Sequence, residues 1–417
     1  MRALSETHTM AQHLIDKGVE IHNPSTIEIG SEVNLDRISG EKVVIFSGCK
    51  IFGETTLIMP GALLGYQSPV TIDNCQLGKN VRLEGGAFLK STFLDRVTIA
   101  CGAQVREACL LEEESSAAHN VGLKQTILFP FVTLGSLINF CDCLMAGGTS
   151  RKDHSEVGSS YVHFNYTPNQ DKATASLIGD VSRGVMLNQK PIFLGGQGGI
   201  VGPCRIEYGT VAAAGSILRK DCLKPNQLWF CTASTQSKNA GFSPGVYKNI
   251  KRQILNNIIY IANLYALRQW YLHIRMLFAG YDKKYEPLYR AALDKISMGI
   301  EERIRRLDEL LQKMPYSIEH SRNINKGVIS EKLIYQKKEL LDNWLRIKDR
   351  LKESAYMEGD KKLRERFINE VEKKVDLGYI KAIKSLDKGM TKVGSSWLGG
   401  IVERIIDEIL HLIPSFR

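Results

Sequence analysis

Apolar residues recur at every sixth position over the first part of the chain, and this spacing limits the possible folds more than any other feature. The first run is Ile21, Ile27, Val33, Ser39, Ile45, Ile51, Leu57 and Leu63, in which Ser39 is the polar exception. Neither a helix nor a flat strand selects every sixth residue. A chain that turns a corner after each short strand does, and each hexad then forms one flat wall. The spacing predicts a β-helix whose coils bury their core only against neighbouring coils.

The same spacing continues in shorter runs that are separated by small changes of phase. These runs are Leu77, Leu83 and Leu89; Ile99, Val105 and Leu111; Val132, Ile138 and Leu144; and Ile200, Ile206, Ala212 and Leu218. Glycines punctuate the hexads, as tight corners with positive φ require. An antiparallel sandwich, the alternative, would show longer alternating strands joined by hairpin turns. We therefore expect a lead-in at 1–20 and a β-helix at 21–222, with an inserted loop at 145–200.

The period changes after residue 245 to that of amphipathic helices. The apolar stripes are Ile254, Ile258, Ile261 and Tyr265; Ile300, Ile304, Leu307 and Leu311; Leu340, Trp344, Ile347 and Leu351; Leu363, Phe367 and Val371; and Val402, Ile405, Ile409 and Ile413. Helices of this kind are not stable alone, so we expect a bundle or a helical layer packed on the β-helix. The sequence thus predicts a linker at 223–245 and an α-helical domain at 246–417.

The net charge of +10 comes from the helical part, because the first 244 residues are close to neutral. A solvated outer helical face is the main interpretation. A membrane-surface helix at 397–413 is an alternative, but Glu403, Asp407 and Glu408 on its polar face fit anionic lipid poorly. Nucleic-acid binding is not predicted, because the aromatic residues lie on apolar stripes and not among the basic residues.

The cysteines and the apolar runs point to a cytoplasmic protein. The first twenty residues contain no continuous apolar segment of the secretory kind, and no run of eighteen apolar residues predicts a membrane span. The nine cysteines include no CxxC pair, which favours free thiols in a reducing compartment. Cys141 and Cys143 face the same side of one strand, but no further ligand completes a cluster, so no metal is predicted.

Residues 146–180, where the hexads fail, contain the residues best suited to chemistry. Arg151 and Lys152 suit an anionic group such as phosphate. His154 is the candidate general base, because imidazole titrates near neutral pH, and His163 is the second choice. The alternative interpretation is a polar surface loop with incidental histidines.

The same window carries a family resemblance. Glu156-Val157-Gly158, Phe164-Asn165-Tyr166, Lys172 and Ile178-Gly179-Asp180 together resemble the acetyltransferase domain of the bifunctional N-acetylglucosamine-1-phosphate uridyltransferase/glucosamine-1-phosphate acetyltransferase family. The resemblance implies a left-handed parallel β-helix of hexapeptide repeats and a homotrimer. It also implies that acetyl-CoA or another acyl-CoA and an amino-sugar phosphate or nucleotide sugar, such as a UDP-N-acetylglucosamine precursor, bind between subunits.

The resemblance also implies roles for single residues. Asn165, Tyr166 and Lys172 would hold the sugar phosphate. The later stretch 208–216 is similar to that family's Ala-Ala-Gly coil, so Ala213 and Ala214 would admit the pantetheine arm of CoA. Three features depart from the family. The family's catalytic His lies farther from its Glu-Ile-Gly corner, a glycine run at 195–199 is inserted as a flexible corner or a ligand-covering lid, and the residues for uridylyl transfer are not present in this sequence.

The predicted reaction is acyl transfer from acyl-CoA to an amine or hydroxyl of a sugar phosphate or nucleotide sugar. His154 would remove the acceptor proton, a backbone N–H would polarise the thioester carbonyl, and the cations Arg151, Lys152 and Lys172 would neutralise phosphate. Two other functions stay open: a non-catalytic trimeric scaffold that binds sugar nucleotides, and a protein that works with a separate sugar-phosphate nucleotidyltransferase.

Overall fold

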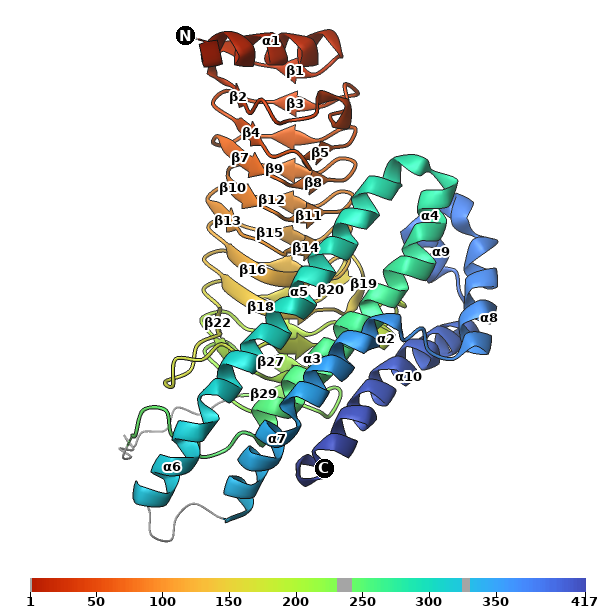
Figure 1. Ribbon diagram of the computed structural model, residues 1–417. Helices are drawn as coiled ribbons and strands as arrows, with labels where there is room; N and C mark the ends of the chain where they lie inside the picture. Colours follow the sequence, from red (N-terminus) through yellow and green to blue (C-terminus); the bar gives the residue numbers. More distant parts are fainter. Residues whose placement is uncertain (1, 231–241, 325–330) are drawn as a thin grey trace.

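The first half of the chain winds into a column of parallel strands, and the second half lays helices along one side of it (Figure 1). This computed structural model describes residues 2–230, 242–324 and 331–417. Helix α1 (Arg2–Asp16) covers the N-terminal end of the column, where Ala11 and Leu14 are buried. The predicted fold class, a parallel β-helix of hexapeptide repeats followed by helices, is confirmed.

Each coil contributes to three walls, and every wall is a stack of parallel pairs. The first wall contains β1 (Glu20–Ile21), β3 (Val44–Ile45), β6 (Leu63–Leu64), β9 (Arg82–Leu83), β12 (Thr98–Ile99), β15 (Ser116–Ala117), β17 (Thr133–Leu134), β21 (Glu156–Val157), β24 (Phe193–Leu194), β27 (Val211–Ala212) and β29 (Leu228–Trp229). The second contains β2 (Glu28–Ile29), β4 (Lys50–Phe52), β7 (Val70–Asp73), β10 (Gly86–Leu89), β13 (Ala103–Val105), β22 (Val162–Phe164), β25 (Gly199–Val201) and β28 (Ile217–Leu218). The third contains β5 (Leu57–Ile58), β8 (Gln76–Leu77), β11 (Thr92–Phe93), β14 (Leu110–Leu111), β23 (Ser176–Ile178) and β26 (Arg205–Ile206).

Two longer strands belong to both the second and the third wall. Strand β16 (Gly122–Leu128) pairs with β13 through its first residues and with β14 through its last. Strand β18 (Asn139–Met145) follows it in register. Each bends at one residue with positive φ, Gln125 (52°) in β16 and Asp142 (58°) in β18. The side chains of these two corner residues are buried, which places them beneath the helical layer and not in solvent.

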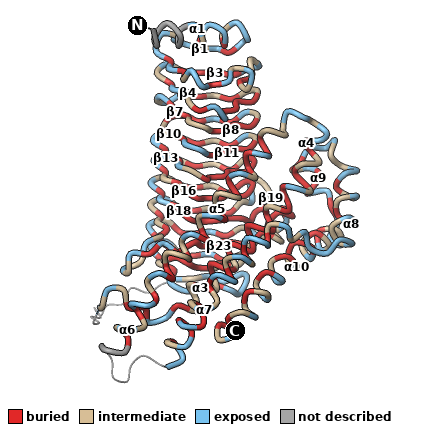
Figure 2. The backbone as a smooth tube through the Cα atoms, in the orientation of Figure 1, coloured by how far each residue is buried: buried red, intermediate tan, exposed pale blue. Residues whose placement is uncertain are grey.

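The interior of the column is a stack of aligned apolar residues. Ile45, Leu64 and Leu83 occupy one column of the first wall, and all three are fully buried. Because each coil turns its apolar residue inward, neighbouring coils bury one another's core. Figure 2 shows this continuous buried interior, with a second buried layer where the helices face the column.

The predicted inward position is wrong by one residue at five places: at Ser39, where Ile38 pairs with the inward Ile58, and at four leucines. Leu57, Leu63, Leu89 and Leu144 face outward, and their neighbours Ile58, Leu64, Phe88 and Met145 point inward. The coils differ in length, so the six-residue phase slips at corners. Outward leucines are tolerated where helices cover the third wall, because both faces of that wall are then buried.

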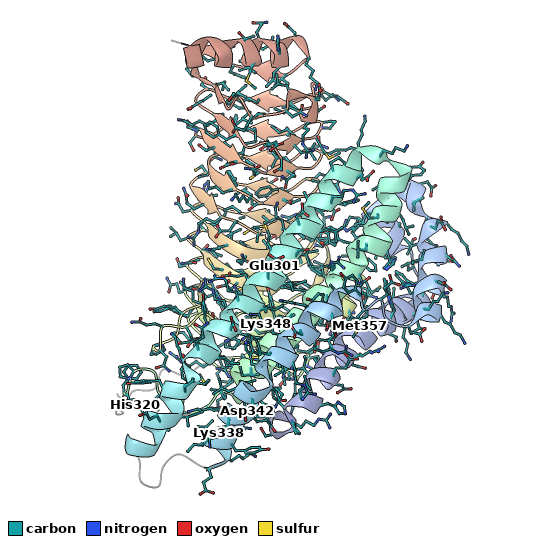
Figure 3. The ribbon with its side chains drawn as sticks, in the orientation of Figure 1. Glu301, His320, Lys338, Asp342, Lys348 and Met357 are labelled. Carbon is teal, nitrogen blue, oxygen red and sulfur yellow. The ribbon has the colours of Figure 1, made fainter. Side chains whose placement is uncertain are left out.

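The helical layer begins with α3 and covers the outer face of the third wall. Its helices are α3 (Lys251–Trp270), α4 (Met276–Tyr281), α5 (Glu286–Gln312), α6 (Met314–Ile324), α7 (Glu331–Glu353), α8 (Lys361–Glu372), α9 (Tyr379–Lys384) and α10 (Lys388–Leu412). Helix α5 contacts β8, β11 and β14, and α3 contacts β23. The outward side chains Gln76, Thr92 and Leu110 are consequently buried. A second layer forms where α7 and α10 pack on α5 and α3; Figure 3 shows Glu301 of α5 and Lys348 of α7, which line one groove.

Three further observations bear on the sequence predictions. Strand β29 extends the column beyond residue 222, and residues 231–241 of the predicted linker lie outside the described residues. Helices long and apolar enough to cross a membrane were not found in the part of the chain that the structure describes. Within these same ranges, no three His, Cys, Asp or Glu side chains are grouped as metal ligands, and eight cysteines are free thiols.

Candidate functional site

The predicted base lies on a short hairpin inserted at the edge between the third and first walls. Strands β19 (Gly148–Ser150) and β20 (Asp153–His154) pair antiparallel, with His154 opposite Gly148. Gly148 has a φ of 100°, and a Cβ there would lie 2.5 Å from the Cα of His154. The hairpin therefore requires glycine at this position, because the two backbones approach too closely for a side chain.

Arg151 at the tip of this hairpin binds the preceding coils. Its Nη1 donates to the carbonyl oxygens of Glu114 (2.9 Å) and Phe131 (3.2 Å) and to Oγ1 of Thr133 (3.0 Å). Lys152 is exposed. Of the two cations predicted to bind phosphate, Arg151 thus anchors the hairpin, and Lys152 is the one that extends into solvent.

His154 is held with one ring nitrogen enclosed and the other near a carboxylate. Its Nδ1 is buried without a hydrogen-bond partner among the described residues, and its Nε2 lies 3.7 Å from Oε2 of Glu156. Asp153 does not orient the ring, because its carboxylate accepts from Oγ1 of Thr149 at 2.7 Å. A carboxylate near an imidazole stabilises the charged ring that forms when the base takes a proton. Glu156 was not among the predicted site residues; its signal is the spacing of two from His154, which puts both side chains on one side of an extended chain.

His163, the second candidate base, lies inside the column. Its side chain is enclosed, and its Nε2 is 2.8 Å from Oγ of Ser176, with the ring edge-on to Phe140. Burial lowers the pKa of His163 to about 4, so the ring is neutral at pH 7. His163 follows the inward-facing Val157 by six residues, and this hexad phase was the signal for its interior position. The structure does not bring His163 and His154 together at one surface.

The predicted sugar-phosphate residues lie on another insertion, at the edge between the second and third walls. Asn165 donates Nδ2 to Oδ2 of Asp142 at 2.6 Å. The side chain of Tyr166 is about half exposed (53%), and Lys172 is exposed. The loop therefore presents an aromatic ring and a cation to solvent next to an amide that is held in place.

Residues of the C-terminal half hold the Asn165 loop in place through hydrogen bonds to residues 169–171. Asp171 accepts hydrogen bonds from the hydroxyl of Tyr247 (2.9 Å) and from Nε2 of Gln253 (2.6 Å). Lys313 donates Nζ to the carbonyl oxygens of residues 169 (2.8 Å) and 170 (2.7 Å). The side chain of Asp171 is buried, so these bonds are shielded from water. One structural role of the helices is thus to hold the loop that contains Asn165, Tyr166 and Lys172.

The predicted CoA residues lie on the edge between the first and second walls. Ala213 is half-buried and Ala214 is exposed. The inserted glycines contact this same edge: a Cβ on Gly195 would lie 2.4 Å from the backbone nitrogen of Ala214, and one on Gly158 would lie 2.4 Å from that of Gly196. The run 195–199 forms the corner between β24 and the start of β25, as the corner interpretation predicts, and its glycines let successive coils pack closely, which gives the lid interpretation no support.

The three predicted groups thus occupy three different edges of the column. The His154 hairpin follows the third wall, the Asn165 loop follows the second, and Ala213 follows the first. A single chain does not bring them to one place. Chemistry that needs all three groups would require edges from more than one copy of the chain.

Sequence comparison finds similarity to proteins named bifunctional protein GlmU. The bifunctional protein GlmU of Thermotoga sp. (strain RQ2) is 24% identical over 212 residues, covering 50% of this chain and 42% of that protein. GlmU of Nitratidesulfovibrio vulgaris (strain DP4) is 26% identical over 226 residues, covering 52% of this chain and 43% of the relative. The chain therefore spans less than half the length of these relatives. No protein-family model matches the chain.

The solved structures that align with the chain include two LpxA proteins. The UDP-N-acetylglucosamine O-acyltransferase (LpxA) of Moraxella catarrhalis RH4 aligns with 67% of this chain and 95% of its own, at 13% identity and a TM-score of 0.18. LpxA of Acinetobacter baumannii aligns over the same shares, at 10% identity and a TM-score of 0.15. These scores give no support for a substrate or a mechanism. The similarity to GlmU over half the chain, together with the parallel β-helix, confirms the resemblance to the left-handed β-helix acyltransferases.

Proposed function

We propose that the protein is an acyltransferase that moves an acyl group from acyl-CoA to an amine or hydroxyl of an amino-sugar phosphate or nucleotide sugar. The observation that carries the proposal is the placement of His154, which sits on a rigid hairpin with a carboxylate 3.7 Å from its Nε2. The similarity to GlmU supports a transferase of this class. We also propose a cytoplasmic location, which the eight free cysteines of the described residues support.

The proposed step needs no nucleophile from the protein. Nε2 of His154 takes the proton from the acceptor as its nitrogen or oxygen forms a bond to the thioester carbonyl carbon. The carbon–sulfur bond then breaks, and CoA leaves as the thiolate, which receives the proton from the imidazolium. Glu156 stabilises that imidazolium, and a backbone N–H at a coil corner stabilises the oxyanion.

We propose a homotrimer in which neighbouring copies complete each site. Cyclic assemblies place different edges of adjacent copies side by side. The third wall is covered by α5 and α3, so contacts between copies would use the first and second walls and their edges. The outward Phe193, Val211 and Leu228 form an exposed apolar row at the end of the first wall, suited to such a contact.

Release of CoA from acetyl-CoA tests the function directly. The acceptors are glucosamine 1-phosphate and UDP-linked amino sugars, and free thiol is followed with a chromogenic disulfide. We expect turnover that falls by about 100-fold or more in His154→Ala, since a general base contributes this much. His13→Ala, at an exposed position on α1, is the matched control and should retain full activity. Saturable binding of these acceptors with no turnover in the wild type would contradict the proposal and favour a sugar-nucleotide-binding scaffold.

A further inference from the structure

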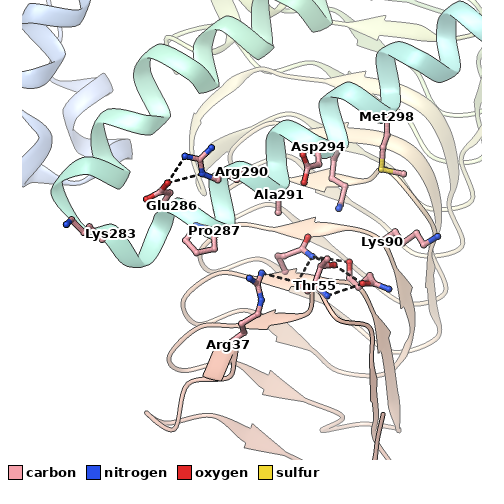
Figure 4. Close-up of a pocket in the computed structure, with 13 residues that line it drawn as sticks. Arg37, Thr55, Lys90, Lys283, Glu286, Pro287, Arg290, Ala291, Asp294 and Met298 are labelled. Atoms are coloured by element: carbon pink, nitrogen blue, oxygen red, sulfur yellow. Dashed lines mark hydrogen bonds and ion pairs between the residues drawn. The ribbon is translucent and has the colours of Figure 1, made fainter. Parts of the chain in front are cut away.

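A cavity lies apart from the His154 hairpin, where the start of α5 crosses the early coils of the third wall (Figure 4). Its volume is about 680 Å³, within the range of small-molecule sites. Residues around β5 and β8 line the cavity on the side of the β-helix, and the first turns of α5 line the opposite side. The cavity shares no lining residue with the hairpin or with the Asn165 loop.

The charges that line this cavity are mostly positive. The cations are Arg37, Lys90, Lys283, Arg290 and Lys295, and the anions are Glu286 and Asp294. Arg290 is neutralised in part, because it donates twice to Oε1 of Glu286 (2.9 and 2.7 Å). Arg37 donates to the carbonyl oxygens of Thr55 and Thr56. The balance of five cations against two anions leaves a positive cavity.

Lys295 is the unusual member of this set. Its side chain is buried, at 7% exposed, yet it forms no hydrogen bond or ion pair with any described residue. Burial lowers the pKa of Lys295, and the adjacent Asp294 offsets this only in part. The thiol of Cys75, which is close enough to interact electrostatically with Lys295, is neutral because burial raises its pKa to about 11. The Lys295 nitrogen is not among the fully enclosed polar atoms that lack a partner, so the ammonium opens onto the cavity, where an anionic ligand would supply the negative charge that the described residues do not.

On the β-helix side of the cavity, the side chain of Gln76 already makes its hydrogen bonds within the protein. Gln76 accepts from Oγ1 of Thr92 (2.9 Å) and donates Nε2 to the carbonyl oxygens of Thr55 (3.0 Å) and Asn74 (3.1 Å). Lys295, with the exposed Lys90 and Lys283, therefore remains to meet a ligand, because no hydrogen bond or ion pair of these three side chains with the described residues was found. The apolar Pro287, Ala291 and Met298 form the rest of the helix side and suit a carbon skeleton.

We propose that this cavity binds a small organic phosphate, with Lys295 as the buried ion partner of the phosphate group. A phosphate monoester carries close to two negative charges at pH 7 and so matches a cavity with several cations. Its oxygens accept from ammonium and guanidinium groups together. The site is separate from the acyl-transfer site, so the ligand would regulate or stabilise the protein and would not be the acyl acceptor.

Calorimetry and thermal unfolding with inorganic phosphate as the probe test the proposal, at constant ionic strength set with NaCl. We expect phosphate to bind saturably and raise the Tm of the wild-type protein. Lys295→Met should weaken binding by about tenfold or more, because the buried ion pair is lost. Without phosphate, the same variant should have a Tm at or above that of the wild type, since it no longer buries an unpaired charge. Lys284→Met, an exposed change of equal charge outside the cavity, should bind as the wild type does.

Other outcomes distinguish this site from the acyl-transfer site. If Lys295→Met does not fold, Lys90→Met replaces it and should weaken phosphate binding severalfold. His154→Ala should keep the phosphate response even if acyl transfer is lost. A response that persists in Lys295→Met and disappears in Lys172→Met would overturn the proposal, as would the absence of saturable phosphate binding in the wild type.

Discussion

Arg303 of helix α5 donates Nη2 to Oδ1 of Asp142 at 2.6 Å, across the contact between the helical layer and the β-helix. Both side chains are almost fully buried, at 2% and 7% exposed. Asp142 is the corner residue at which β18 bends between two walls, and its other oxygen accepts from Asn165. One carboxylate therefore joins a coil corner, a helix and the candidate substrate loop.

Loss of this ion pair should destabilise the whole protein. Arg303→Met leaves the buried carboxylate of Asp142 without its cation, which costs about 3–5 kcal/mol in comparable cases. Arg305→Met is the matched control on the same helix, because Arg305 pairs with Glu302 and Glu309 at the surface and should change stability by about 1 kcal/mol or less. Urea unfolding measures both free energies. An equal loss of unfolding free energy in the two variants would show that the buried ion pair contributes no more to stability than the surface pairs do.

Stability should fall as the pH drops from about 6.5 towards 4, because of His163. The folded protein holds His163 neutral with a pKa of about 4, whereas the unfolded chain protonates it near its ordinary value of 6.5. The unfolded state binds more protons between these values, so up to about 3 kcal/mol is lost across this window. Unfolding free energies at pH 7 and pH 5 should differ less in His163→Gln than in the wild type. His13→Gln, at an exposed position, should leave the pH dependence unchanged.

Two glycines should respond oppositely to alanine. Gly195→Ala places a Cβ 2.4 Å from the backbone nitrogen of Ala214, so coils must separate and the Tm should fall. Gly400, in helix α10, has open space around it, and Gly400→Ala should stabilise by about 1 kcal/mol through helix propensity. Thermal unfolding compares the two variants. A neutral Gly195→Ala would mean that the coils do not pack as closely as the structure shows.

Arg151 should affect turnover without affecting substrate affinity. Its three hydrogen bonds to preceding coils position the hairpin that carries His154. Arg151→Met removes all three bonds, which come from the one nitrogen Nη1, and we expect kcat to fall by about tenfold or more with KM nearly unchanged. Lys152→Met should show the reverse pattern, with a higher KM, if Lys152 meets the phosphate. A raised KM with normal kcat in Arg151→Met would assign Arg151 to substrate binding instead.

The hexad spacing was enough to predict the β-helix, because a period of six has a single simple structural cause. It did not predict the exact inward residue at every coil. Leu63 and Leu64 are adjacent and both apolar, so the pattern does not distinguish them once a corner adds a residue. The burial of the outer face of the third wall was also not predictable, because Leu57 and Leu144 are apolar and would fit the core on either face.

The arrangement of the candidate site residues was not predictable, and their roles stay predictions. His154, Asn165 and Ala213 were proposed from motif and chemistry, but sequence alone does not show which edge of the column an insertion occupies. Contacts between residues that are far apart in the sequence were also not predictable. Arg303 and Asp142 are separated by 161 positions, and nothing in either segment indicates the other.

The most direct test of the account is complementation between two inactive variants. If each site takes His154 from one copy and Asn165 from its neighbour, His154→Ala and Asn165→Ala should each lack acyl transfer. Unfolding and refolding an equal mixture should then restore about a quarter of the wild-type rate of CoA release, because a quarter of the interfaces receive both intact residues. No recovery in mixed trimers, with both variants folded and trimeric, would contradict a site shared between copies.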